Sequence, residues 1–128
     1  MILRGFLAFG LVLSITNFAT TASATGDAAK GKKVFKKCVA CHAIKAGKHK
    51  TGPSLAGIIG RDAGKATGFK KYKGLKGADW KWDEASLDGW LKNPKKWLKA
   101  KNGKRSAMVY KLKKEKDRQD VIAYLKAN

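Results

Sequence analysis

The chain has 128 residues and carries 29 Lys and Arg against 9 Asp and Glu, a formal net charge of +20. This length suits one domain, and such a charge attracts acidic protein surfaces, anionic lipid or nucleic acid. Because the sequence has only two cysteines and two histidines, it lacks the second cysteine pair that a zinc site built on two such pairs requires.

The first 24 residues are typical of a targeting segment. Residues 1–4 form a short basic segment, and residues 5–15 are mostly apolar. Ala22-Ser23-Ala24 has the small-x-small pattern of a cleavage site. The apolar run is too short and too soon interrupted to span a bilayer comfortably. We expect a cleavable signal peptide over 1–24, a domain over 25–128 and export to the bacterial periplasm. Retention as an uncleaved anchor is the alternative. Export to the periplasm argues against nucleic acid as the binding partner of this basic protein.

A helix is predicted to begin at Asp27, which is a good N-cap and suits the helix dipole. Gly31, Val34, Phe35 and Cys38 then recur at three- and four-residue spacing and give one apolar face. Lysines fill most of the remaining helix surface.

The stretch Cys38-Val39-Ala40-Cys41-His42 carries the strongest chemical signal. Its two thiols can add to the two vinyl groups of a haem, and the adjacent imidazole can then bind the iron. A thioredoxin-like redox pair would need a βαβ context, which the sequence does not favour. A structural disulfide and half of a metal site are further alternatives, and we favour haem attachment over all three.

Loops are predicted after this motif. We expect His49 to be a solvated histidine, because nothing near it in the sequence holds it in place. A carbonyl at Pro53 could accept the second ring N–H of His42 and so orient the imidazole. An ordinary loop proline is the alternative.

Three further residues follow in the loops. Arg61 could pair with a haem propionate or with groups around Asp62, and the hydroxyl of Tyr72 could reach a propionate. We expect Phe69 to belong to the core.

The next helix is predicted to start at Asp83, with Ser86 in its first turn. Its inward face should consist of Leu87, Trp90 and Leu91. Asn93-Pro94 ends it, since the residue before a proline disfavours the helical region.

Pro94 then begins a short helix that we expect to run through Leu98. Trp82 and Trp90 are core residues by general rule, although in so small a domain packing in the core and contact with a cofactor coincide. A lysine-rich loop is expected over residues 99–107.

Met108 is the one methionine left if Met1 leaves with the signal peptide. It could fill a gap in the core, since the thioether is soft and adaptable. It could instead be the sixth ligand of the iron, which raises the reduction potential. We favour ligation, because His49 is the only rival ligand.

A closing helix is expected over residues 113–126. Its apolar face consists of Val121, Ile122, Tyr124 and Leu125. Gly31 would let this helix cross the first one closely.

Together these pieces resemble the class I c-type cytochromes over essentially the whole mature chain. The resemblance rests on Gly31 to Phe35, Cys38/Cys41/His42, Gly52-Pro53-Ser54-Leu55, Gly60-Arg61, Gly68-Phe69, Trp82-Asp83-Glu84, Asn93-Pro94-Lys95-Lys96, Met108 and Asp120-Val121-Ile122-Ala123-Tyr124-Leu125. It implies an all-α fold whose first and last helices cross, with loops wrapped around one covalent haem c. In place of the Pro-Gly-Thr turn of the mitochondrial form, residues 98–104 make a longer loop before Met108, which is similar to the bacterial cytochrome c-two type.

The resemblance also implies roles for individual residues. Cys38 and Cys41 would hold the haem, and His42 and Met108 would be the axial ligands. Pro53 would accept from His42, and Gly31 and Phe35 would pack on Val121 and Tyr124. The remaining contacts are implied for Arg61, Tyr72 and Trp82 near the propionates and for Trp90 in the place of a haem-packing aromatic.

The function so implied is that of a soluble, monomeric one-electron carrier, not an enzyme. Its lysines would steer it to acidic surfaces of a cytochrome bc-type complex and of a terminal oxidase or photosynthetic reaction centre, and peripheral contact with an anionic membrane is compatible with the charge. One alternative is a haem enzyme or gas sensor with an open iron site, in which Met108 is core. Another is a basic module that binds anionic lipid or polymer and whose cysteines form a disulfide.

Overall fold

The computed structural model describes residues 26–128, so the expected signal peptide lies outside the described residues. In this part of the chain the regular structure consists of four helices, with one isolated antiparallel bridge between Asp62 and Lys81. The predicted all-α class is confirmed. None of these four helices is long and apolar enough to cross a membrane.

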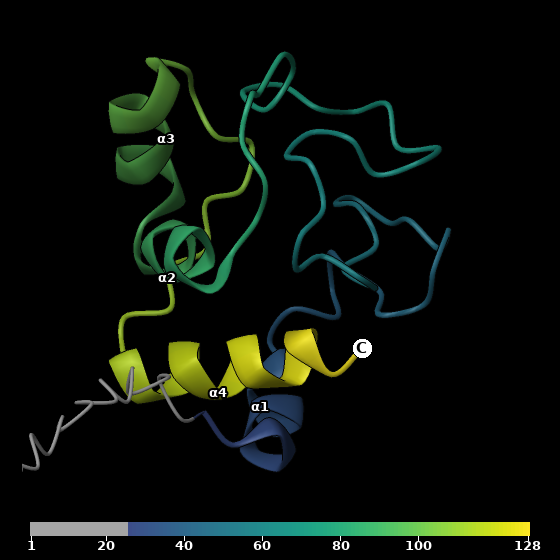
Figure 1. The fold of residues 1–128 in the computed structure, drawn as a ribbon, viewed down its shortest axis with the longest axis vertical. Coiled ribbons are helices and arrows are strands. Elements are labelled where there is room, and N and C mark those ends of the chain that lie inside the picture. Colours follow the sequence, from purple (N-terminus) through teal and green to yellow (C-terminus); the bar gives the residue numbers. More distant parts are fainter. Residues whose placement is uncertain (1–25) are drawn as a thin grey trace, which may run out of the picture.

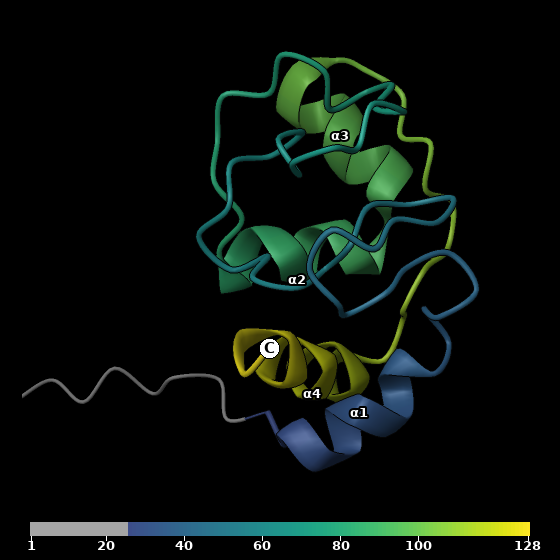
Figure 2. The ribbon, with the colours of Figure 1, turned by 90° about the vertical axis from the view of Figure 1, so that its right-hand side faces the viewer.

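Helix α1 (Ala28–Phe35) crosses α4 (Glu115–Lys126), as Figures 1 and 2 show. The Asp27 side chain caps α1 by accepting from the Lys30 backbone N–H at 3.0 Å, as predicted. The crossing is close because position 31 is glycine: a Cβ there would lie 1.9 Å from the Asp120 carbonyl oxygen. Thus only a residue without a side chain fits this contact.

Two further contacts join α1 to α4. The rings of Phe35 and Tyr124 lie 5.3 Å apart, which confirms the pairing that the resemblance implied. The buried carboxylate of Asp120 accepts from the Asp27 backbone N–H at 2.7 Å and from Lys116 Nζ at 2.7 Å. The beginning of α1 is therefore tied to the middle of α4 by a charged acceptor.

Helix α2 (Glu84–Lys92) begins with the predicted cap. Asp83 accepts from the Ser86 backbone N–H at 2.7 Å, and the Ser86 hydroxyl accepts from the Asp83 backbone N–H at 2.9 Å. The inward residues Leu87, Trp90 and Leu91 are buried, as expected.

Helix α3 (Pro94–Asn102) is four residues longer than the sequence predicted. Residues 99–102, expected as loop, continue the helix because they include good helix formers, and the helix ends at Gly103, whose φ of 74° is left-handed. Helix α4 in turn starts two residues later than expected, because the backbone of Lys114 is extended and the Lys113 carbonyl accepts from Arg118 Nη1 at 2.7 Å.

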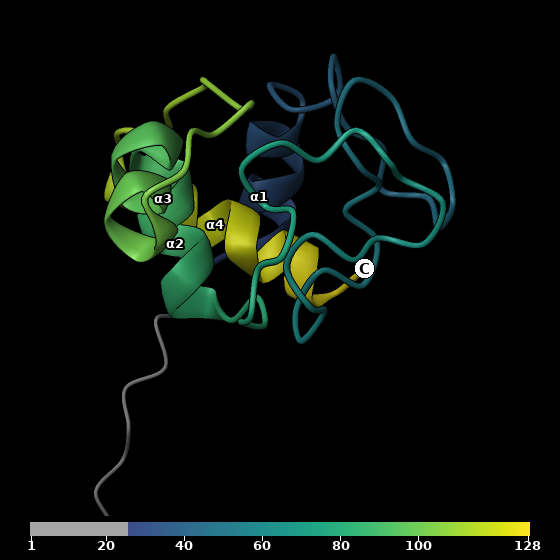
Figure 3. The ribbon, with the colours of Figure 1, turned by 90° about the horizontal axis from the view of Figure 1, so that it is seen from above.

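The hydrophobic core lies where α4 packs between α1 and α2 (Figure 2). Its helical members are Phe35, Leu87, Trp90, Leu91, Leu98, Val121, Ile122 and Leu125. Viewed from above, α2 and α3 lie on one side of α4, and the loops between α1 and α2 lie on the other (Figure 3). These loops are joined to the helical part by backbone bonds such as Gly57 N–H to the Asn128 carbonyl at 2.8 Å.

Candidate functional site

The two cysteines lie in a turn that continues α1. The backbone N–H groups of Cys41 and His42 both donate to the Cys38 carbonyl, at 3.1 and 2.9 Å. Both cysteines are free thiols, with Cys38 half-buried and Cys41 exposed. Burial raises the pKa of the Cys38 thiol, against the opposing effect of Lys37. The pair is therefore free to form two thioether bonds.

The imidazole of His42 is held in one orientation. Its Nδ1 donates to the Pro53 carbonyl at 2.7 Å, so the expected hydrogen bond is present. Because a carbonyl only accepts, Nδ1 carries the hydrogen and Nε2 keeps its lone pair. No residue within 26–128 forms a hydrogen bond with Nε2. This is the arrangement that a metal-binding histidine needs.

Two features keep that ring available as a ligand. Burial lowers the pKa of His42, and the nearby charges of Arg61 and Lys50 lower it further, although the bond to Pro53 opposes them. The ring is thereby favoured in its neutral form, which is the form that binds a metal. Gly52 packs directly against it: a Cβ at this position would lie 2.3 Å from His42 Cε1.

Met108 lies in the loop between α3 and α4, where its side chain is half-buried against the core. Its sulfur accepts from Trp90 Nε1 at 3.2 Å, and its backbone carbonyl accepts from the Ser106 hydroxyl at 2.8 Å. A thioether sulfur has two lone pairs, so one remains for a metal.

Four tryptophans form a cluster in which each ring contacts at least two others, and we call it the indole cluster: Trp80, Trp82, Trp90 and Trp97. Trp82 and Trp97 are stacked at 5.8 Å, and the other pairs meet close to edge-on. The sequence singled out Trp82 and Trp90 but not Trp80 and Trp97. The spacing of Trp80 and Trp82 was an available signal, since residues two apart on an extended segment share a face.

The three residues expected near the propionates are neighbours: the Trp82 backbone N–H donates to the Arg61 carbonyl at 2.9 Å, and the Tyr72 hydroxyl lies near the Arg61 side chain. Arg61 donates to the Ser54 carbonyl at 2.9 Å and not to Asp62, which pairs instead with Lys81 at 2.8 Å. Burial lowers the pKa of Arg61, and the nearby Tyr72 hydroxyl opposes this.

Two side-chain donors in this region, on Tyr72 and on Trp80, have hydrogens without an acceptor among residues 26–128. The Tyr72 hydroxyl accepts from the Ala66 backbone N–H at 3.1 Å, which leaves its own hydrogen unused. Next to Trp82, the Nε1 of Trp80 is buried with no acceptor among residues 26–128. An unpaired buried N–H costs about 1–3 kcal/mol. An acceptor supplied by a bound group would remove this cost.

The expectation that His49 is solvated is wrong. The residue is half-buried, its Nε2 donates to the Thr67 carbonyl at 2.8 Å, and its Nδ1 accepts from the Ser54 backbone N–H at 3.0 Å. Phe69, expected in the core, is only half-buried and packs on His49 with a ring separation of 5.5 Å. Both ring nitrogens of His49 are thus engaged, and the only rival to Met108 as a second axial ligand is occupied.

The donor set fits a covalently attached haem. It comprises two free thiols, an imidazole with an open Nε2, a thioether sulfur at the core and unused donors on Tyr72 and Trp80. Within residues 26–128, no group of three or more His, Cys, Asp or Glu side chains is placed to hold a separate metal ion.

The chain matches the family model described as cytochrome c over residues 28–128. It is 38% identical to the cytochrome c2 of Rhodospirillum rubrum over 130 residues, covering 96% of each chain, and 47% identical to the cytochrome c of Chlamydomonas reinhardtii, covering 79% of this chain and 88% of the relative. The solved structure of cytochrome c2 from Rhodospirillum centenum superposes with a TM-score of 0.73 at 37% identity, over 80% of this chain and 98% of that one.

Proposed function

This chain belongs to the cytochrome c family, and we propose from that premise that His42 and Met108 are the two axial ligands of its iron. Members of the family are electron carriers, not enzymes, and have one covalently bound haem c. The fold is that of the class I cytochromes c. When bound, haem c supplies an iron that takes up and releases one electron.

In this proposal Cys38 and Cys41 hold the haem by thioether bonds. The Pro53 carbonyl fixes the His42 ring and makes Nε2 a stronger electron-pair donor to the iron, as carbonyl partners do for metal-bound histidines. Met108 occupies the opposite position, with its sulfur held by Trp90. Arg61, Tyr72 and Trp82 direct donors to the propionates. The hydrogen bond from His42 Nδ1 to Pro53 is the single observation on which this assignment most depends.

We further propose a periplasmic location, with the chain cut near Ala24 to leave a domain over residues 25–128. Its partners would be a cytochrome bc-type complex as donor and a terminal oxidase or photosynthetic reaction centre as acceptor. The support is the signal-like sequence of residues 1–24 together with the net charge of +20, which favours acidic surfaces.

The test of the ligand assignment is the absorption spectrum of the purified holoprotein, oxidised and reduced. We expect a low-spin spectrum with the weak near-infrared band of sulfur bound to ferric iron. Met108→Leu should abolish that band and admit carbon monoxide to the reduced iron. The matched control is Val109→Leu, which changes the neighbouring side chain, 61% exposed, and should keep both properties. A wild-type protein without the band that binds carbon monoxide quickly would instead indicate an open iron site.

The test of the partner assignment is salt dependence. Surface charges are screened over about 10 Å at 0.1 M ionic strength and about 30 Å at 0.01 M. Electron transfer to an isolated membrane complex should therefore slow strongly across this range. A rate indifferent to salt would contradict a steering role for the lysines.

A further inference from the structure

The end of α3 is joined to a distant loop by one carboxamide. Asn102, the last residue of α3, donates from Nδ2 to the Gly74 carbonyl at 3.1 Å and accepts at Oδ1 from the Lys104 backbone N–H at 3.0 Å. We call this pair of hydrogen bonds the Asn102 bridge. It uses both the donor and the acceptor of the amide. Next to it, Gly74 packs so closely on the Arg105 carbonyl that a Cβ at position 74 would overlap it.

The Asn102 bridge fixes the start of the segment 102–108, which ends at Met108. A second bond lies beside it, since Lys104 Nζ donates to the Lys76 carbonyl at 2.7 Å. That bond is exposed and competes with water, whereas the bond to Gly74 is half-buried. Removing the donor from a half-buried carbonyl costs more than removing an exposed bond. The placement of the segment therefore depends strongly on this one amide.

The same carboxamide is followed by a glycine that can react with it. Asn102-Gly103 is the only Asn-Gly step in the sequence. The backbone nitrogen of the following residue can attack the side-chain amide carbon, and glycine hinders this attack least because it has no Cβ. The new N–Cγ bond closes a five-membered imide, the Cγ–Nδ2 bond breaks, and ammonia leaves with the proton of the backbone nitrogen. Water then opens the imide to aspartate or isoaspartate.

The folded structure keeps both reacting groups engaged. The Gly103 N–H donates to the Lys99 carbonyl at 2.9 Å, and the Asn102 amide is held by the bridge. The reaction therefore requires the end of α3 to open first. Once it opens, Lys99 and Lys101 in the last turn of α3 supply positive charge that favours the deprotonated nitrogen, which is the attacking form. Local opening is thus the step that limits the rate.

We propose that Asn102 is a self-modifying site, whose deamidation irreversibly releases the segment 102–108 from the loop at Gly74. The product side chain has acceptor oxygens and no donor, so it repels the carbonyl that the amide had bound. Its negative charge at the C-terminal end of α3 also opposes the helix dipole. The bridge does not depend on the ligand assignment. Only the consequence for the iron, a weaker hold on Met108, rests on the proposed function.

The first experiment follows deamidation of the oxidised holoprotein at mildly alkaline pH by peptide mapping and mass spectrometry, with a synthetic peptide of residues 97–107 as the unfolded reference. Asn93 is the internal control, because the Pro94 nitrogen has no hydrogen to lose. Asn102 should react about 10- to 100-fold more slowly in the protein than in the peptide, since local opening comes first. Lys104→Gln, compared with its own peptide, should react faster than the wild type. Equal rates in peptide and protein, or no reaction over about a hundred peptide half-times, would overturn the proposal.

The second experiment tests the bridge itself. Asn102→Asp carries the product side chain, and Asn102→Ala removes the donor but adds no charge. The readout is native-state hydrogen exchange of the holoprotein at the backbone N–H groups of residues 73–78 and 103–108. Exchange should accelerate about 2- to 10-fold in both variants, which is the effect of losing one hydrogen bond.

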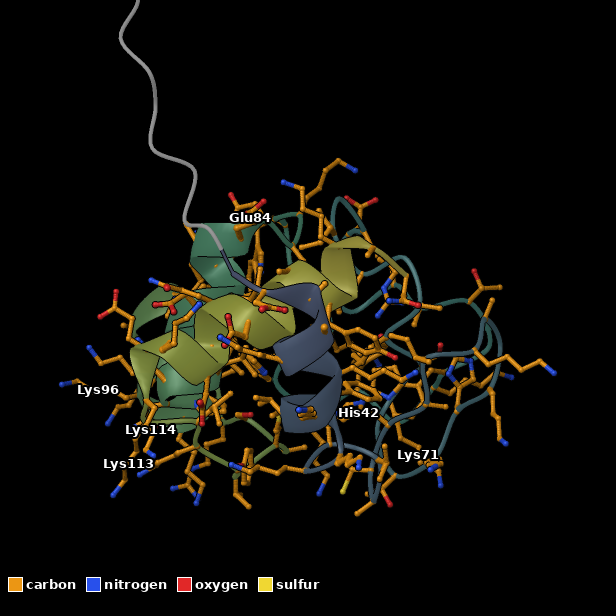
Figure 4. The ribbon with its side chains drawn as sticks, turned by 90° about the horizontal axis from the view of Figure 1, so that it is seen from below. His42, Lys71, Glu84, Lys96, Lys113 and Lys114 are labelled. Atoms are coloured by element: carbon orange, nitrogen blue, oxygen red, sulfur yellow. The ribbon has the colours of Figure 1, made fainter. Side chains whose placement is uncertain are left out.

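The matched control is Asn93→Asp, at the start of α3. Within the described residues Asn93 uses only its acceptor oxygen, which accepts from the Lys96 backbone N–H at 3.1 Å, and aspartate keeps that acceptor. Figure 4 shows Lys96 on the opposite side of the molecule from Lys71, which lies in the same loop as Gly74. The control should leave exchange in both stretches within about twofold of the wild type.

Three outcomes separate the explanations. Faster exchange in Asn102→Asp but not in Asn102→Ala would mean that charge at the helix end moves the segment, and would overturn the bridge. Equal acceleration in the control would overturn it as well. The near-infrared band of the wild type reports on the ligand separately: a protein without this band whose exchange still accelerates in both Asn102 variants would refute Met108 as the ligand and support the bridge.

Discussion

The packing of Gly52 against His42 predicts that one added methyl group disturbs the iron-binding side of the protein. In Gly52→Ala the new Cβ would lie 2.3 Å from His42 Cε1, 2.7 Å from Nδ1 and 2.9 Å from Nε2. The backbone at position 52 does not adopt a positive φ, so alanine brings no strain of its own. Either the imidazole or the loop must move.

The cost of that movement can be estimated from what is lost. Turning the ring off its rotamer costs about 0.5–1.5 kcal/mol. Losing the hydrogen bond to the Pro53 carbonyl costs about 0.5–1.5 kcal/mol more. Against these losses, alanine lowers the conformational entropy of the unfolded chain relative to glycine, which stabilises the folded state by roughly 0.4–1 kcal/mol. We therefore expect Gly52→Ala to lower the free energy of unfolding by about 1–2 kcal/mol.

The assay is guanidinium unfolding of the oxidised holoprotein, followed by circular dichroism, together with the rate at which added imidazole replaces a protein ligand. Pro53→Ala is the matched control, because it keeps the backbone carbonyl that accepts from His42 while it removes the stiffness of the proline ring and adds one backbone N–H. The control should lose less than about 1 kcal/mol and keep the wild-type rate of imidazole binding. If Gly52→Ala were as stable as the wild type and bound imidazole at the same rate, the close packing against His42 would not constrain the ring.

Three further predictions follow from single contacts. Gly31→Ala should destabilise the protein by about 1–3 kcal/mol through overpacking on the Asp120 carbonyl, although helix propensity alone predicts a gain in stability. A variant more stable than the wild type in guanidinium unfolding would refute the crossing geometry. Trp90→Phe removes the donor to the Met108 sulfur, which then donates more strongly to iron, so the midpoint potential in a redox titration should fall, and an unchanged potential would count against this bond. The bonds from the Asp27 N–H and from Lys116 lower the pKa of Asp120 in the folded protein. Its carboxylate therefore stabilises the fold at any pH above the pKa of aspartate in the unfolded chain, about 3.9. This contribution is lost as the pH falls through the pKa of Asp120 in the folded protein. Asp120→Asn should therefore be less stable than the wild type at pH 7 and should approach it near pH 3 in urea unfolding, whereas a gap independent of pH would contradict the assignment.

Much of the local structure could be predicted from the sequence, because the groups that determine it lie within four positions of one another. Asp27 and Asp83 accept from backbone N–H groups three residues ahead, and Pro94 starts a helix where its missing N–H costs nothing. The spacing of Cys38, Cys41 and His42 indicated haem attachment for the same reason. The order of such local signals along the chain also carried the family resemblance and with it the fold.

Other features depend on partners that lie far along the chain, and only the folded structure brings these together. His49 looked solvated because its partner Thr67 is 18 positions away, and nothing local in the sequence indicated that Asp120 accepts from the N–H of Asp27, 93 positions distant. Burying a charged or polar group is tolerated only where such partners satisfy it, and the sequence does not say which distant groups will meet. The lysines around the cavity between α2 and α3 have the same origin. They lie on α2, on α3 and on the segment before α4, and they meet because Arg118 and Leu112 hold that segment against α2.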